Sequence, residues 1–424
     1  MATHPSAVSE RIGTGFGRPV AGPGSLPRPY RVAAIFHRPH PYFCKFFERL
    51  AARPEIDLTV YFYSDLGVSS TFDAGYQRSV RWDTDLLSGY KNHFLRNYAP
   101  QPNLSRYLGL FHPGLLSELR RGYDAVILHG WWGLSSSLVI LSAFLQGTPL
   151  LIHSDKSAME PGGAPHGRLR DVVLPRLFRH AAGFLAVGRS NADFYRKLGV
   201  PEEKMFFTPL AVDNAFFQAE QRHLAPQREA IRRKLGIPSG AVVFLYVGRL
   251  NLRKGLLDLL RAFAALSAES AHLMFVGDGP DRPALESYAM RHGIGRVHFT
   301  GLRNYSELPA SYAASDVFVL PSHHEPWGAV INEAMNFAMP VVASRVVGAA
   351  ADLVDDGVNG FLFEPGNVAQ LTRRLQLLLG RPDLRKRMGR ESARRIAGWD
   401  YDCGVEGVLA ALGSVVRLRD PHET

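Results

Sequence analysis

Two basic residues and a glycine follow an apolar run in the second half of the chain. Val242–Val247 is entirely apolar, Gly248 and Arg249 follow it directly, and Lys254 comes five residues after Arg249. A buried strand that ends in a glycine turn before a helix would present both cations and the helix N-terminus at one point. Guanidinium and ammonium groups so placed can neutralise a diphosphate without a metal ion. A solvated basic loop would have the same residues, so this motif alone leaves both interpretations open.

Two glutamates eight residues apart form the most specific pattern. Glu325 precedes Pro326, which disfavours a helical conformation, so we expect Glu325 in a loop. The next helix is expected to begin near Gly328, with Glu333 in its second turn and the N–H groups of Gly328 and Ala329 exposed to a phosphate. Eight helical residues span roughly 12 Å, too far for a catalytic pair. We therefore expect the carboxylates to hold two ends of one elongated ligand; a loop cap and a surface helix residue are the alternative interpretations.

Three further residues are candidates because each ends an expected strand or follows one. Gly277 belongs to a glycine turn, but Arg282 stands where a dinucleotide fingerprint needs its third glycine, so we expect only a strand-to-helix turn beside the ligand. In the first half, His153 is our candidate for a catalytic residue near the reacting carbon. His129 ends another expected strand and is its rival. For either, a hydrogen-bonded structural histidine is the alternative.

The elements that position these residues are short apolar runs alternating with helical patterns. Expected strands are 31–36, 58–63, 125–128, 150–153, 183–187, 242–247, 272–276, 297–299, 317–320, 341–344 and 361–363, and expected helices are 40–52, 115–121, 134–145, 171–180, 255–266, 282–292 and one after Trp327. Such alternation predicts parallel sheets covered on both faces, with ligands at the carboxyl ends of the strands. Asn359–Gly360 is expected to form a tight turn. With a charged seam near 213–240, the sequence predicts an α/β protein of two Rossmann-like domains facing across a cleft.

Composition restricts the remaining function classes. Lys and Arg exceed Asp and Glu by 49 − 39 = 10, which suits a polyanionic small ligand, an anionic membrane surface or a merely solvated surface; we expect no nucleic-acid partner. Two cysteines make neither a disulfide framework nor a metal cluster and fit a reducing cytoplasm. The best apolar run, 134–145, is too short to span a membrane, and 1–7 lacks a secretory pattern. We expect a cytoplasmic protein, with peripheral contact at the inner membrane face left open.

From Phe244 to Pro365 the sequence resembles the donor domain of retaining glycosyltransferases of family 4, which have the GT-B fold. The motifs that carry the resemblance are E-x7-E at Glu325 and Glu333, G-R-x4-K-G at Gly248, Arg249, Lys254 and Gly255, and G-x-G-P at Gly277–Pro280. The resemblance implies that Arg249 and Lys254 hold the donor diphosphate and that Glu333 binds the ribose. It implies that Glu325 holds hydroxyls of the transferred sugar and that Leu302 lies in the base-binding loop.

The resemblance also implies the domain organisation. Trp399–Tyr401 resembles the point where the last helix crosses back, so we expect a mobile leader at 1–28, a first domain at 29–213 completed by 400–424, and a donor domain at 214–399. The sequence departs from the family after its first strand, where 37–42 replaces a glycine-rich loop. A milder departure is Asp352, where the family has a glutamate.

The expected activity is transfer of a sugar from a UDP-, GDP- or ADP-linked donor to an acceptor hydroxyl with retention of configuration. Asp-x-Asp pairs at 83–85 and 400–402 lie outside the donor motifs, so we expect no cofactor and no obligatory metal. The family and the basic surface favour a lipid-linked or cell-envelope saccharide as acceptor. A soluble small-molecule acceptor, a nucleotide-sugar epimerase or hydrolase, and a non-catalytic nucleotide-sugar-binding protein are the alternatives.

Overall fold

The computed structural model describes residues 27–417 except 74, 104–105, 158–166 and 267, and of 167–173 it describes the backbone alone. The expected leader lies outside the described residues apart from its last two. Arg28 lies 2.5 Å from Asp124, so the chain is already paired with the first domain before the first strand begins. No helix among the described residues has the length and apolarity needed to cross a bilayer.

The first sheet has seven parallel strands in the order β5-β2-β1-β6-β7-β8-β9. Its strands are β1 (Tyr30–Phe36), β2 (Ile56–Phe62), β5 (Lys91–Phe94), β6 (Ala125–His129), β7 (Leu150–Ser154), β8 (Gly183–Ala186) and β9 (Met205–Phe207). Every residue of β1 except Arg31 is buried, as expected of a parallel strand with helices on both faces.

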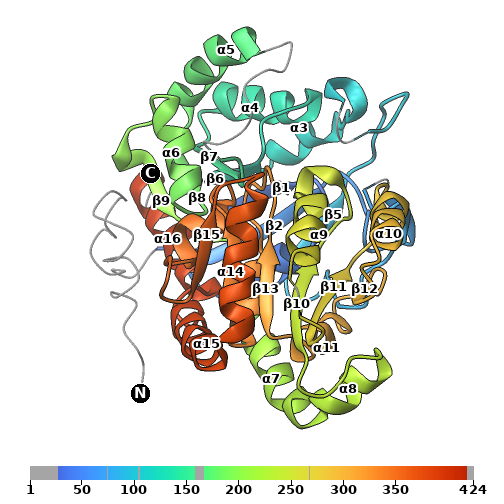
Figure 1. Cartoon of the computed structure of the whole chain (residues 1–424). Coiled ribbons are helices and arrows are strands. Elements are labelled where there is room, and N and C mark those ends of the chain that lie inside the picture. Colours follow the sequence, from blue (N-terminus) through green and yellow to red (C-terminus); the bar gives the residue numbers. More distant parts are fainter. Residues whose placement is uncertain (1–26, 74, 104–105, 158–166, 267, 418–424) are drawn as a thin grey trace.

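Helices from both ends of the chain cover this sheet. They are α2 (Pro41–Ala51), α3 (Gly114–Leu119), α4 (Leu134–Gln146), α5 (Gly167–His180), α6 (Arg189–Lys197) and α16 (Tyr401–Val415). On one face, Phe47 and Leu50 of α2 share a core with Val405 and Val408 of α16. Figure 1 shows α16, in red, beside β9, although α16 follows the last helices of the second domain. The first domain is therefore completed by the C-terminal helix.

The second sheet has six parallel strands in the order β12-β11-β10-β13-β14-β15. They are β10 (Val242–Val247), β11 (Ala271–Val276), β12 (Val297–Phe299), β13 (Val317–Leu320), β14 (Val341–Ser344) and β15 (Gly360–Phe363). Their helices are α7 (Asn214–Leu224), α8 (Arg228–Lys234), α9 (Leu256–Ala264), α10 (Arg282–Arg291), α11 (Leu308–Ala313), α12 (Val330–Asn336), α13 (Gly348–Leu353), α14 (Val368–Gly380) and α15 (Pro382–Ile396). This strand order is that of a Rossmann fold, with its switch point between β10 and β13. The predicted fold class is confirmed.

Two local predictions were wrong. A tight turn does precede β15, but it covers 357–359, with the positive φ of 82° at Gly357, whereas Gly360 already begins the strand. Asn359 is buried, and its side-chain amide donates to the carbonyl of Leu353. The helix after Trp327 begins at Val330 rather than near Gly328, so Glu333 lies in its first turn.

The first domain also contains a β-hairpin that no sequence pattern indicated. It consists of β3 (Thr71–Asp73) and β4 (Arg78–Val80), which pair antiparallel outside both large sheets. We call residues 71–83, without Ala74, the clasp segment, because they contact three loops of the second domain. Arg78 pairs with Asp278 after β11, and Asp83 bonds to Ser306 after β12. The third contact joins Asp73 to the loop after β10.

Candidate active site

A pocket lies between the two domains at the carboxyl ends of their strands. Its lining residues are His40, Pro41, Tyr42, Tyr76, Trp82, Val247, Gly248, Val276, Gly277, Leu302, Arg303, Tyr305, Leu308, Val330 and Glu333. Four predicted donor-binding residues, Gly248, Gly277, Leu302 and Glu333, meet here. Parallel strands place their ligands at this edge. We call this the donor pocket.

The floor of the donor pocket is bare backbone. Val247 of β10 pairs with Val276 of β11, so Gly248 and Gly277 leave the sheet side by side. A Cβ atom on Gly277, whose φ is 139°, would lie 1.9 Å from the carbonyl oxygen of Gly248. A side chain at position 277 would therefore push the two strand ends apart, so glycine lets their main chains lie against each other in the pocket lining.

Glu333 is fully buried at the back of the donor pocket. The hydroxyl of Tyr42, from α2 of the first domain, donates to Oε1 at 2.5 Å, and that of Tyr312 donates to Oε2 at 2.5 Å. Burial raises the pKa of Glu333 to about 7, although both hydroxyl groups oppose the rise. A buried carboxylate held by two hydroxyls is a group suited to a pair of ligand hydroxyls, and Tyr42 takes one of those positions.

Glu325 and Lys254 form an ion pair with 2.5 Å between Oε2 and Nζ. The motifs predict that they hold different parts of a ligand, and the structure joins them at one place on the second domain. Gly328 has a φ of 95°, and a Cβ on it would lie 3.2 Å from the Glu325 side chain. Ala329 immediately precedes α12, which has seven residues. Phosphate contacts by the N–H groups of Gly328 and Ala329 stay a prediction.

Arg249 is held by the clasp segment of the first domain. One Nη atom lies 3.3 Å from Asp73, and the guanidinium carbon lies 4.9 Å from the centre of the Tyr76 ring. Asp73 also pairs with Arg38, from the loop after β1. Burial acts to raise the pKa of Asp73, but Arg249, the N–H of Gly75 and Arg38 hold it below its ordinary value. Asp73 was absent from our sequence-based candidates, since nothing in its surroundings marks a site.

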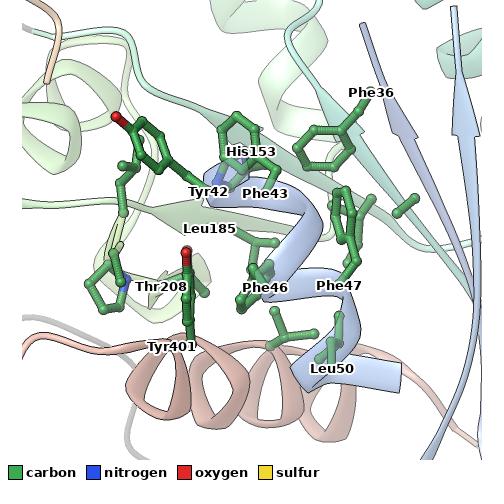
Figure 2. Close-up of a pocket in the computed structure, with 16 residues that line it drawn as sticks. Phe36, Tyr42, Phe43, Phe46, Phe47, Leu50, His153, Leu185, Thr208 and Tyr401 are labelled. Atoms are coloured by element: carbon green, nitrogen blue, oxygen red, sulfur yellow. The ribbon is translucent and has the colours of Figure 1, made fainter. Parts of the chain in front are cut away.

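His153 lies in a second, apolar cavity rather than in the lining of the donor pocket. Figure 2 shows this cavity beneath α2, with Phe43, Phe46 and Phe47 turned into it and the hydroxyl of Tyr42 turned away. The Nδ1 atoms of His153 and His129 lie 2.8 Å apart, so the two rival histidines are hydrogen-bonded to each other.

Burial favours the neutral form of both histidines at physiological pH. Burial lowers the pKa of His129 to about 4. Burial, and then the neighbouring His129, hold the pKa of His153 well below its ordinary value. In a neutral imidazole, the ring nitrogen that does not bond to the other histidine can accept or donate one proton. A catalytic role for His153 stays a prediction.

The Asp-x-Asp pairs have structural partners. Asp85 accepts hydrogen bonds from the N–H groups of Leu87 and Ser88, and Asp400 caps α16 through the N–H of Cys403. Within the described parts of the chain, no three His, Cys, Asp or Glu side chains gather in a metal-binding cluster. The expectation of no obligatory metal stays a prediction.

Known proteins share both halves of this architecture. The family model described as glycosyl transferases group 1 matches residues 227–395, and that of the glycosyl transferase 4-like domain matches residues 39–211. D-inositol 3-phosphate glycosyltransferase of Kineococcus radiotolerans is 31% identical over 353 residues, which cover 75% of this chain and 78% of that relative. The chain belongs to glycosyltransferase family 4. The resemblance seen in the sequence is thereby confirmed, and the chain is a transferase.

Two further proteins are similar to this family 4 glycosyltransferase. 2-Deoxystreptamine glucosyltransferase of Streptomyces kanamyceticus is 33% identical over 311 residues, which cover 67% of this chain and 78% of that relative. The crystal structure of HepE from Anabaena in complex with UDP has a TM-score of 0.70 and 21% identity, covering 91% of this chain and all of that chain. The structural likeness shows that the GT-B fold is shared.

Replacing Tyr42 by phenylalanine is expected to destabilise this family 4 glycosyltransferase in a pH-dependent way. The variant leaves one oxygen of the buried Glu333 without its donor, which costs about 1.5–3 kcal/mol when the carboxylate is ionised. At pH 5, below the pKa of about 7, Glu333 is protonated and the loss should be smaller. Thermal unfolding at pH 5 and pH 8 measures the difference. Tyr98→Phe removes an exposed hydroxyl and is the control; equal effects of the two variants at pH 8 would contradict the prediction.

Proposed function

We propose that this glycosyltransferase transfers a sugar from a UDP-sugar to an acceptor hydroxyl with retention of anomeric configuration. The observation that carries the proposal is the donor pocket, where Gly248 and Gly277 expose backbone beside Leu302 and the buried Glu333. Glu333 is suited to ribose hydroxyls, which would replace the hydroxyl of Tyr42. The UDP bound by the Anabaena neighbour supports uridine over the guanosine and adenosine alternatives.

The chemistry follows from where charge develops. The bond between the anomeric carbon and the diphosphate oxygen breaks, and its electrons stay on the diphosphate. Arg249 and Lys254 would stabilise that negative charge as it forms, and such electrostatic stabilisation is usually the largest single contribution to catalysis. The acceptor hydroxyl would attack the face that the diphosphate leaves, and its proton would pass to a phosphate oxygen. This course needs no carboxylate nucleophile, no cofactor and no obligatory metal.

The acceptor we propose is a small soluble polyol or aminocyclitol. The support is the names of two relatives, of which one glycosylates D-inositol 3-phosphate and the other glucosylates 2-deoxystreptamine. A lipid-linked or envelope saccharide is the second candidate. It is favoured by Leu141, Phe144 and Leu145 of α4, which are exposed and would suit contact with a cytoplasmic membrane face; the ring of Phe144 lies against His180.

The test begins with donors and ends with products. UDP-, GDP- and ADP-sugars are screened by thermal shift, and the donors that bind are incubated with inositol phosphates, aminocyclitols and lipid-linked saccharides. Mass spectrometry then detects the product, and the NMR coupling constant of its anomeric proton gives the configuration. We expect a product of retained configuration from a UDP-sugar. Hydrolysis or epimerisation of donor alone, or donor binding without turnover on every acceptor, would overturn the proposal.

A further inference from the structure

Two arginines from different domains converge on one carboxylate beside the donor pocket. Nη1 of Arg38 lies 3.2 Å from Oδ2 of Asp73, and Nη2 of Arg249 lies 3.3 Å from the same oxygen. The Asp73 side chain is 9% exposed, so this oxygen is largely withdrawn from water. An oxygen anion between two guanidinium groups has the surroundings of a bound phosphoryl oxygen.

The clasp segment fits closely over Arg249. The N–H of Gly75 donates to Oδ1 of Asp73 at 2.7 Å, which leaves Oδ2 directed to the arginines. A Cβ atom on Gly75 would lie 2.5 Å from the guanidinium carbon of Arg249. Tyr76 covers the guanidinium with its ring, and it also lines the donor pocket. Asp73 therefore lies next to the pocket, because Tyr76 joins the arginine it binds to the pocket lining.

A histidine of the donor pocket also lies close to Arg38 and Arg249. His40, which lines the donor pocket, has its pKa lowered to about 3 by burial and then by Arg38 and Arg249. Its Nδ1 atom is buried and has no hydrogen-bond partner among the described residues. A neutral imidazole with an unused nitrogen, beside two cations, is a further polar group for a ligand.

We propose that Arg38 is a phosphate-binding residue alongside Arg249 and that the diphosphate of the donor replaces the carboxylate of Asp73 between them. The inference rests on the proposed function. Binding would draw one phosphate oxygen to a cation from each domain, because Arg38 follows β1 and Arg249 follows β10. The same step would release Asp73 and with it one of the three loop contacts that join the clasp segment to the second domain. Asp73 and the diphosphate of the donor would thus compete for the same position between Arg38 and Arg249.

The test compares UDP affinities of the full-length chain by isothermal titration calorimetry. Arg38→Ala should weaken UDP binding by about tenfold or more, since it removes a charge-assisted contact. Arg38→Lys should lose less, because it keeps the charge. Asp73→Asn should tighten UDP binding several-fold, because the competing charge is gone. Binding of uridine, measured by competition, should change in none of these variants, since uridine has no phosphate.

A double variant distinguishes a direct contact between Arg38 and the phosphate from an effect of Arg38 on the position of Asp73. If Arg38 only steadied Asp73, Arg38→Ala would have no effect in the Asp73→Asn background, and the proposal would be wrong. We expect the tenfold loss to persist there. Arg196→Ala, which breaks the exposed ion pairs of Arg196 with Asp193 and Glu202, is the matched control and should bind UDP as the parent does. Weaker binding by Asp73→Asn would also overturn the proposal. A parent chain that binds no UDP, GDP or ADP would overturn the proposed function as well, whereas normal UDP binding by Arg38→Ala would overturn this inference alone.

Discussion

Arg249→Ala and Lys254→Ala are each expected to lower kcat by about 10²–10³-fold, the usual effect of removing one group that stabilises developing negative charge. Both cations have anionic partners of the chain, Asp73 and Glu325, which a diphosphate would have to displace. Their largest contribution should therefore come when charge forms on the leaving group. Steady-state kinetics with the donor found by the screen measures kcat and KM separately.

Two further variants show whether the loss of kcat is due to the loss of the charge at position 254. Lys254→Ala leaves Glu325, whose side chain is 14% exposed, without its partner, so Lys254→Gln is used to retain a hydrogen bond without the charge. Arg253→Ala is the matched control, because Arg253 is an exposed cation next to Lys254 on the same turn. We expect Lys254→Gln to be as impaired as Lys254→Ala and Arg253→Ala to be active. Unchanged kcat in Arg249→Ala and both Lys254 variants would exclude leaving-group stabilisation by these residues.

Glu333→Gln is expected to raise the stability of the folded protein and to lower its affinity for the donor. The folded-state pKa of about 7 lies above the ordinary value of 4.5, so the folded protein holds a proton that the unfolded chain releases. The resulting penalty is absent below pH 4.5, grows up to pH 7 and is complete above it, where it is on the order of 3 kcal/mol. Glutamine has the same shape and no charge, and it can exchange hydrogen bonds with Tyr42 and Tyr312.

The two effects of Glu333→Gln are measured separately. Thermal unfolding at pH 8 should show a midpoint several degrees higher than that of the parent, and the two midpoints should converge near pH 4.5. Titration with UDP should show a loss of about tenfold or more, because ribose hydroxyls lose a charged acceptor. Asp402→Asn, on the exposed side of α16, is a control for the loss of one negative charge. A Glu333→Gln variant with parental UDP affinity would remove Glu333 from the donor site.

The parts of the fold predicted well from the sequence are those with a strong local signal. The run Val242–Val247 is a strand in the structure, with no residue exposed, because parallel strands covered on both faces are continuous apolar runs. The hairpin of β3 and β4 carries no such signal. Its strands have three residues each, and several of these are polar or exposed. Asn359–Gly360 has the composition of a turn, but the tight contact of Gly360 with Val341 places Gly360 in β15, and the turn covers 357–359.

The donor motifs located the site, but not the contacts within it. Gly248 and Gly277 follow neighbouring strands, so topology alone brings them together. The hydrogen bond between Tyr42 and Glu333 joins residues 291 positions apart and crosses between domains. No spacing rule predicts such a pair. Arg38 did stand in a loop that departs from the family, and that departure was the one signal available for it.

The return of α16 to the first domain has a consequence for the order in which the chain can fold. Val405, Val408, Ala411 and Leu412 complete the core that α2 and β1 begin. During synthesis these four residues leave the ribosome after the whole second domain. The N-terminal half must therefore wait, with the part of this sheet face beside α2 uncovered, until the second domain has been made. That interval is when chaperone binding or aggregation would compete with completion of the enzyme.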